Sequence, residues 1–339
     1  MNVQEQVYHL LKEGYSQRIS DIYLFPHPKG YQITFRQNNQ QRLYRQIDQS
    51  LGEKVLVHLK YLADMDVAEK RRMQVGSATY PLDEKVALRL RFSTVADYQN
   101  RESMVVRFLY TAEYGGTFIT FLPKMYQKLL KESRKSGLYL FSGPTGSGKT
   151  TTMYHLAQHL AENQQVITIE DPVEMEQPAF LQLQINEAIE ATYERLVQLC
   201  LRHRPDILIV GEIRDEQTAR AVVRGALTGH TIFSTVHASD GPGVWLRLIE
   251  LGVSPEELKQ CLKGITYQRL LPIYCPYCEK KCSAYCPTKQ VGVLYDSYFL
   301  EERGEVREIF QAKDRWNERL KKIWALGYIT EETYLAFQH

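Results

Sequence analysis

Apolar positions in the first third of the chain follow helical spacing in two segments and strand spacing in several others. The helical segments are residues 7–11 and 51–62, and the strand segments are residues 22–24, 31–35, 86–92 and 104–110. Within residues 86–92 every second side chain is apolar, and Arg89 and Arg91 fill the positions between them on the polar face. This mixture of elements predicts an N-terminal α+β domain over residues 1–112.

After residue 112 the pattern changes to short apolar runs that alternate with helical stretches. The runs cover residues 138–141, 166–169, 207–210 and 231–236, and residues 254–271 and 313–337 also have helical patterns. Strands that alternate with helices are typical of a parallel sheet with helices on its faces. We therefore predict an α/β fold with a mostly parallel sheet over residues 113–339.

Length, charge and hydropathy narrow the class of protein. The chain has 339 residues, enough for two domains, and a formal net charge of +2. This balance lacks the basic footprint of nucleic-acid binding, so no direct contact with nucleic acid is expected. No apolar run approaches the roughly 20 residues that span a bilayer, and the first residues lack the features of a signal peptide. A cytosolic protein is expected.

A glycine-rich segment lies between one predicted strand and the helical pattern that follows it. It reads Gly143-Pro144-Thr145-Gly146-Ser147-Gly148-Lys149-Thr150-Thr151 and fits G-x-x-x-x-G-K-[ST]. The glycines let backbone N–H groups converge on one point, where the helix N-terminus adds partial positive charge. Lys149 is placed to reach the β- and γ-phosphates of ATP, and Thr150 to bind Mg²⁺. The alternative is a strand-to-helix turn that binds no nucleotide.

Two acidic segments follow predicted strands of the same domain. Glu212 follows the C-terminal end of the strand at residues 207–210, where a carboxylate can hold Mg²⁺ or one of its waters. Glu170, Asp171 and Glu174 lie within five residues, and their mutual repulsion favours a metal ion or an ordered water among them. An acid there is a candidate to orient or deprotonate the attacking water. Taken alone, such a turn is more often a solvated loop.

Two histidines bracket the predicted strand at residues 231–236. A neutral imidazole at His230 or His237 can sense a γ-phosphate or couple the site to a neighbouring subunit. The chain has no N-K-x-D segment, which argues against a GTPase.

Together these segments resemble the secretion ATPases of type II secretion, type IV pili and competence pili. Besides the phosphate loop, residues 168–174 are similar to the Asp box of that family, residues 211–215 to its Walker B segment and residues 228–239 to its His box. In the first domain, residues 19–23 are similar to its S-D-I-H element and residues 72–76 to its R-x-P-Q-D-G element. The resemblance covers about residues 17–300.

The resemblance implies a PAS-like N-terminal domain, a RecA-like C-terminal domain and a ring of six subunits with ATP between the domains. It implies that Glu174 is the catalytic base, and that Arg91 and Arg107 reach phosphate charge; without it both would be solvated strand-face arginines. Departures from the family pattern include Tyr23 for the histidine of S-D-I-H and Met73 for the proline of R-x-P-Q-D-G. The phosphate loop, Glu174 and Glu212 match the pattern.

Four cysteines lie close together after residue 270. They are Cys275, Cys278, Cys282 and Cys286, in an insertion that we place at residues 272–290. Four thiolates at this spacing can bind one tetrahedral Zn²⁺, and in a chain without an export signal zinc is favoured over disulfides. The alternative is four reduced thiols in a turn-rich loop. Cys200 and Cys261 fall in helical patterns and are expected in the core.

The short chain and the cysteine cluster make the sequence most similar to the ComGA-type ATPases of Gram-positive competence. A hexameric ATPase is therefore expected at the inner face of the cell membrane, driving assembly of a pilus or pseudopilus for DNA uptake. Its implied partner is the polytopic platform protein of that machine. The alternatives are a type II secretion or type IV pilus motor, a RecA-like DNA translocase, and a nucleotide-gated scaffold that hydrolyses little ATP.

Overall fold

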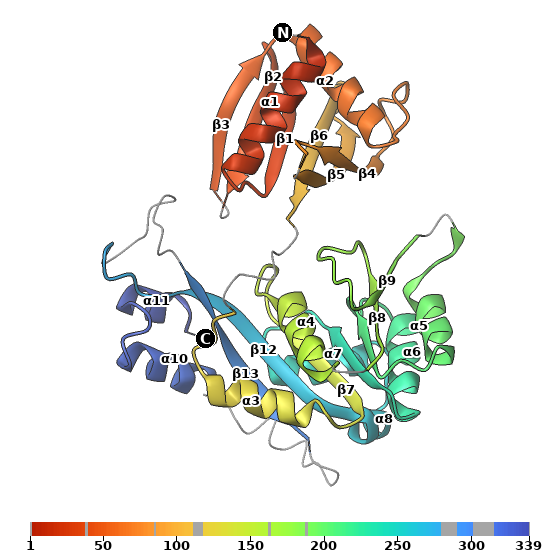
Figure 1. Cartoon of the computed structure of the whole chain (residues 1–339), viewed down its shortest axis with the longest axis vertical. Coiled ribbons are helices and arrows are strands. Elements are labelled where there is room, and N and C mark those ends of the chain that lie inside the picture. Colours follow the sequence, from red (N-terminus) through yellow and green to blue (C-terminus); the bar gives the residue numbers. More distant parts are fainter. Residues whose placement is uncertain are drawn as a thin grey trace. The chain divides into compact units, whose positions relative to one another are not determined.

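In a computed structural model the chain forms two compact units, Met1–Tyr114 and Gly115–His339 (Figure 1). The structure describes residues 2–37, 40–84, 86–110, 118–161, 164–186, 189–278, 290–300 and 315–338. Each unit has its own sheet and its own hydrophobic core. Within these described ranges no helix is long and apolar enough to cross a membrane.

The N-terminal unit is a six-stranded antiparallel sheet with two helices on one face. The helices are α1 (Val3–Ser16) and α2 (Gln49–Leu62). The strands are β1 (Asp21–His27), β2 (Gly30–Gln37), β3 (Gln40–Ile47), β4 (Gln74–Pro81), β5 (Ala87–Ala96) and β6 (Glu102–Leu109), in the order β3-β2-β1-β6-β5-β4. Leu88, Leu90 and Phe92 on β5 are buried in the same core as both helices, whereas Arg89 and Arg91 point to the other face, as their alternation predicts.

The sequence pattern missed the two edge strands of this sheet. β3 is rich in glutamine and arginine, and β4 has no residue that is fully buried. Neither strand therefore has the strong apolar alternation by which a half-buried strand is recognised. A tight hairpin turn at Pro28 and Lys29 joins β1 and β2. Gly30 begins β2 at φ +130°, where a Cβ atom would lie 2.2 Å from the Ile47 carbonyl oxygen.

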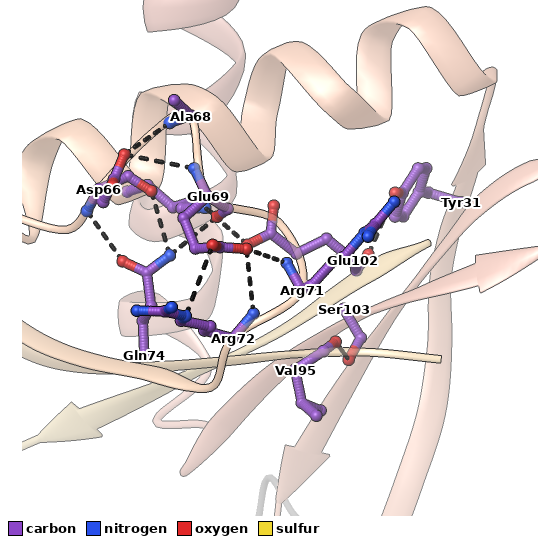
Figure 2. A network of polar contacts seen from close by, with 11 residues as sticks. Tyr31, Asp66, Ala68, Glu69, Arg71, Arg72, Gln74, Val95, Glu102 and Ser103 are labelled. Carbon is purple, nitrogen blue, oxygen red and sulfur yellow. Dashed lines mark hydrogen bonds and ion pairs between the residues drawn. The ribbon is translucent and has the colours of Figure 1, made fainter. Parts of the chain in front are cut away.

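A buried ion pair and a network of polar contacts fix the segment between α2 and β4 (Figure 2). Lys60 is fully buried, and its Nζ lies 2.7 Å from Glu102 Oε1 and 2.5 Å from the Glu69 carbonyl oxygen. Gln74 Nε2 donates to the carbonyl oxygens of Asp66 and Glu69 at 3.0 and 2.9 Å. The acids of this segment also accept hydrogen bonds from its own backbone N–H groups. The loop is thus held by the interior of the unit.

The C-terminal unit is built on a seven-stranded, mostly parallel sheet. The strands are β7 (Gly137–Ser142), β8 (Val166–Glu170), β9 (Leu181–Gln184), β10 (Ile207–Val210), β11 (Thr231–Thr235), β12 (Leu262–Pro272) and β13 (Val291–Phe299). Their order is β13-β12-β7-β11-β10-β8-β9, and only β13 pairs antiparallel to its neighbour. The helices are α3 (Pro123–Glu132), α4 (Lys149–Leu160), α5 (Tyr193–Arg202), α6 (Glu216–Leu227), α7 (Gly241–Glu250), α8 (Pro255–Cys261), α10 (Arg315–Ala325) and α11 (Glu331–Ala336).

Both faces of this sheet are covered, which explains the uninterrupted apolar runs of its central strands. One face packs against α5, α6, α7 and α8, and the other against α3 and α4. Successive residues of β7 alternate between the two cores: Leu138 and Leu140 face the first set of helices, and Tyr139 and Phe141 face the second. Cys200 on α5 and Cys261 on α8 are buried in the first core, as expected.

The prediction of one helix over residues 254–271 was wrong, because a helix covers only its first half. Ser254 and Glu257 form a capping box that starts α8, and at Leu262 the chain enters β12. β12 is held between β7 and β13, so long-range pairing decides its conformation. β13 was not predicted. Residues 313–337 contain two helices, α10 and α11, with Gly327 between them at φ +76°.

Candidate active site

A pocket of about 610 Å³ surrounds the phosphate loop at the carboxyl edge of the C-terminal sheet. It is lined by Thr145, Gly146, Ser147, Gly148, Lys149, Thr150 and Thr151, and also by Glu170, Asp171, Glu174, Glu212, Arg214 and His237. In a parallel sheet the carboxyl ends of all strands meet at one edge, so the segments after β7, β8, β10 and β11 converge here. Of the predicted phosphate-loop residues, Gly143 and Pro144 lie outside the lining.

The glycines of the loop hold it in a shape that other residues rarely adopt. Gly143, Gly146 and Gly148 have φ values of +141°, +77° and +82°. At Gly143 a Cβ atom would also lie 2.2 Å from the Gln268 carbonyl oxygen, so β12 fits directly against the loop. Gly148 is the N-cap of α4, whose free N–H groups therefore begin at the pocket. This geometry fits the phosphates of a nucleotide.

Lys149 bends back over the loop that carries it. Its Nζ donates to the carbonyl oxygens of Gly143 at 2.8 Å and Pro144 at 3.1 Å. Burial lowers the pKa of Lys149 from its ordinary value, while the Glu212 and Glu174 carboxylates act in the opposite direction. Lys149, Glu174 and Glu212 line the same pocket, so the structure brings these three predicted residues together.

Glu212 lies just after β10, close to one guanidinium group and one imidazole ring. It forms an ion pair with Arg214, and its Oε2 lies 3.6 Å from His237 Nε2. Arg214 also lies 3.9 Å from Asp171, so it connects the two acidic segments. Mg²⁺ prefers oxygen ligands such as carboxylates and hydroxyls. The carboxylate of Glu212 and the hydroxyl of Thr150, in the first turn of α4, both line the pocket and fit a magnesium ion.

The segment after β8 presents its two glutamates differently. Glu170 is 4% exposed, and its Oε1 accepts hydrogen bonds from the hydroxyls of Tyr154 at 2.5 Å and Thr168 at 2.7 Å. Burial raises the pKa of Glu170, and these hydrogen bonds partly oppose the rise. Glu174 is exposed between Val173 and Met175, which are both buried. Buried neighbours on each side anchor the backbone at Glu174 while its carboxylate stays accessible.

The excess of acidic side chains in the pocket lining favours binding of a divalent cation. Its lining includes the carboxylates of Glu170, Asp171, Glu174 and Glu212, whereas its fixed cations are Lys149 and Arg214. A nucleotide triphosphate would add further negative charge to a site in which acids already outnumber bases. Because like charges at short range are costly, a metal ion bound with the phosphates fits this donor set.

The structure does not bring every candidate into this pocket. His230 precedes β11, whereas His237 follows it, so five residues or about 17 Å of extended strand separate the two ends. His230 Nδ1 instead lies 3.2 Å from the Gly225 carbonyl oxygen at the opposite edge of the sheet. A contact between His230 and phosphate in the pocket of its own chain was therefore a wrong expectation, and the coupling to a neighbouring subunit stays a prediction.

The two candidate arginines belong to the N-terminal unit, where they lie side by side. Arg91 on β5 and Arg107 on β6 are direct register partners, and Arg107 Nε donates to Asp21 Oδ1 at 2.7 Å. The Arg107 side chain is 59% exposed, so its guanidinium group remains accessible beside that ion pair.

Half of the cysteine cluster lies outside the described residues. Cys275 is buried and Cys278 is partly buried, and both follow the end of β12. Cys282 and Cys286 fall in residues 279–289, which the structure does not describe. Within the part of the chain that is described, no group of three or more His, Cys, Asp or Glu side chains is arranged to hold a metal ion. The zinc site stays a prediction.

Three polar residues behind the pocket were missed. Tyr154 on α4, Thr168 on β8 and the partly buried Gln182 on β9 join Glu170 in one hydrogen-bond network. Thr168 and Glu170 are two residues apart on a strand, a spacing that puts both on one face. That spacing was the available signal, but nothing in the pattern of residues 181–184 showed that they form an edge strand beside β8.

The sequence of this chain is similar to those of known proteins. The family model described as "Type II/IV secretion system protein" matches residues 2–320. Competence protein ComGA of Streptococcus pneumoniae is 48% identical over 269 residues, which cover 79% of this chain and 85% of that protein. ComGA of Bacillus subtilis is 36% identical over 341 residues, with coverage of 96% and 95%. Type II secretion system protein E of Klebsiella pneumoniae is 34% identical over 278 residues, 80% of this chain and 55% of that protein.

Solved structures agree on the fold. The crystal structure of the pilus retraction motor PilT with bound ADP superposes with a TM-score of 0.72 at 21% identity, over 97% of this chain and 96% of that chain. The Legionella pneumophila ATPase DotB gives a TM-score of 0.71 at 19% identity, over 96% and 93%. At such identities the likeness establishes the mixed α/β fold of the chain.

Proposed function

This chain belongs to the Type II/IV secretion system protein family and is an ATPase, and we propose that it drives assembly of a competence pilus or pseudopilus for DNA uptake. The observation that carries the proposal is a pocket in which the phosphate loop, Glu174 and Glu212 meet. The assignment to competence is supported by ComGA of Bacillus subtilis, which is 36% identical to this chain. The aligned region covers 96% of this chain and 95% of that protein.

The proposed chemistry is in-line attack by water on the γ-phosphorus of ATP. Glu174, exposed on an anchored backbone, is suited to take the proton of the water. Lys149 and the N-terminus of α4 hold the phosphates, and Thr150 and Glu212 would hold Mg²⁺. The bound ion would neutralise charge on the β- and γ-phosphates. Glu170 is the reserve candidate for the base, although its carboxylate already accepts two hydroxyl donors.

The proposed architecture has two domains and a six-membered ring. Residues 1–112 would form a PAS-like domain and residues 113–339 a RecA-like domain. Arg91 and Arg107 would supply positive charge to the transition state, for which planar guanidinium groups are suited. His230, at the edge of the sheet away from the phosphate loop, would couple to a neighbouring subunit in the homo-hexamer.

The proposed location is the cytoplasmic face of the cell membrane, where the ring would dock on the polytopic platform protein of the machine. A structural Zn²⁺ held by Cys275, Cys278, Cys282 and Cys286 would order residues 272–290. The support for zinc is the spacing of four thiols in a short segment, because such a segment buries little apolar surface of its own.

Two measurements test the function. The first is phosphate release from ATP by the purified chain, and the second is transformation of the host after Lys149→Ala is introduced into its gene for this protein. We expect the wild-type chain to release phosphate from ATP, and the host variant to lose transformation by added DNA. A type II secretion motor is the second candidate, favoured by 34% identity to protein E of Klebsiella pneumoniae. Normal transformation together with loss of a secreted protein would replace the first assignment by the second.

A further inference from the structure

One side chain on the edge strand β9 bonds to separate segments around the candidate active site. Gln182 Nε2 donates to the Met175 carbonyl oxygen at 2.7 Å and to the Tyr154 hydroxyl at 2.8 Å. Gln182 Oε1 accepts from the Gln177 backbone N–H at 2.7 Å. A glutamine amide has two donor hydrogens and one acceptor oxygen, so these contacts use both ends of the group.

The neighbours fix the orientation of this amide. A backbone N–H only donates and a backbone carbonyl only accepts, so the oxygen of Gln182 must face Gln177 and its nitrogen must face Met175. The Tyr154 hydroxyl therefore accepts from Gln182 and donates its own proton to Glu170 Oε1. One continuous set of hydrogen bonds thus runs from the backbone beyond Glu174 to the carboxylate of Glu170.

The backbone bonded by Gln182 is the one that carries Glu174. Met175 follows Glu174 directly, and on the other side the Val173 backbone N–H donates to Gln184 Oε1 at 3.3 Å. Gln182 and Gln184 are two residues apart on β9 and therefore project to the same face. β9 is itself held in register by β8, with Thr168 opposite Gln182. The acidic segment is thus tied to the sheet on both sides of Glu174.

We propose that Gln182 is a positioning residue for ATP hydrolysis, which fixes Glu174 relative to Glu170 and to the helix that follows the phosphate loop. The inference rests on the proposed role of Glu174 as base. A catalytic group that is misplaced by about 1 Å can lose roughly 10²-fold in rate. The side-chain hydrogen bonds of Gln182 reach Gln177, Met175, Tyr154 and Glu170 and none of the residues of the phosphate loop. We therefore expect substitution to lower the rate and to leave nucleotide binding in place.

Two substitutions remove the donor hydrogens of the amide, and one of them keeps its acceptor. Gln182→Met keeps the length of the side chain and removes all of its hydrogen bonds. Gln182→Glu keeps an acceptor for the Gln177 N–H but sets a carboxylate oxygen against the Met175 carbonyl. In both variants we expect kcat for ATP to fall by about 10–100-fold with KM nearly unchanged. Gln198→Met, at an exposed position of α5, is the matched control and should keep wild-type kinetics.

The decisive measurement is the double variant Gln182→Met with Glu174→Gln. If Gln182 acts through Glu174, the double variant turns over no more slowly than Glu174→Gln alone, because the positioned group is already lost. A general loss of packing would instead multiply the two effects and overturn the inference. Wild-type kcat in both single Gln182 variants would overturn it as well, while the proposed function stands. A wild-type chain that hydrolyses no ATP would overturn the proposed function and this inference together.

Discussion

Replacing Lys60 by Met should destabilise the N-terminal unit strongly, because it leaves a buried carboxylate without its cation. Lys60 is fully buried, Glu102 is 6% exposed, and their charged atoms lie 2.7 Å apart. Removing one partner of a buried ion pair costs about 3–5 kcal/mol. For a unit of this size each kcal/mol lowers Tm by about 4 °C, so Lys60→Met should lower it by roughly 12–20 °C.

A double-variant cycle distinguishes the energy of the Lys60–Glu102 ion pair from a general loss of packing. Glu102→Gln alone leaves the ammonium group buried and should also be costly, whereas Lys60→Met with Glu102→Gln removes both charges and should recover most of the loss. Lys54→Met, at an exposed position of the same helix, is the matched control and should change the free energy of unfolding by less than about 0.5 kcal/mol.

The three tryptophans make the assay specific to one unit. Trp245, Trp316 and Trp324 are the only tryptophans of the chain, and all belong to the C-terminal unit. Far-ultraviolet circular dichroism follows both units, so denaturant unfolding of Lys60→Met should gain an early transition in dichroism that tryptophan fluorescence does not follow. A loss below about 1 kcal/mol, or a double variant that loses the sum of both single losses, would refute the reasoning.

Four other predictions concern the site and the metal. Glu174→Gln should bind ATP as the wild-type chain does but hydrolyse it about 10²–10⁴-fold more slowly, measured by separate binding and phosphate-release assays. Arg91→Ala and Arg107→Ala should each lower kcat by about 10³–10⁵-fold while circular dichroism shows a folded chain. Cys278→Ser should remove zinc from protein purified without added metal, measured by elemental analysis, and should leave nucleotide binding intact. Glu170→Gln should raise the free energy of unfolding above about pH 4.5 and lose that advantage below it, because burial penalises the charged form of Glu170.

The phosphate loop was predictable because its chemistry leaves few alternatives. Backbone N–H groups can converge on a phosphate only where glycine permits positive φ, and all three predicted glycines have such values. The central strands were predictable for a related reason, since burial on both faces requires continuous apolar runs. Both the positive φ values of the loop and the burial of the strands on two faces depend on residues that are adjacent in the sequence.

The strands at and next to the edges of the sheets were not predictable, because long-range pairing decides their conformation. β12 has residues that suit either a helix or a strand, and its conformation follows from β7 and β13 on its two sides. β9 is a four-residue strand whose register with β8 places Gln182 beside Thr168. A local pattern does not contain that register, so the network behind Glu170 became visible only in three dimensions.

The polarity of the strands in a parallel sheet is enough to predict the position of His230. Once residues 231–236 were assigned to a parallel sheet together with the strand before the phosphate loop, the carboxyl ends of both strands had to share one edge. A histidine that precedes such a strand must then lie at the far edge from the phosphates. Strand polarity therefore separates His230 from His237, although the two are only seven positions apart in the sequence.

The charge of the pocket bears on the proposed role of the two arginines. Four carboxylates and two fixed cations line it, and a magnesium ion offsets only part of the charge that ATP would add. Hydrolysis spreads further negative charge over the γ-phosphoryl oxygens, so cations from outside this lining would lower the barrier. In the N-terminal unit, Arg91 and Arg107 are direct register partners, an arrangement that like charges disfavour. Asp21 forms an ion pair with Arg107, and an anion bound beside both arginines would relieve the remaining repulsion.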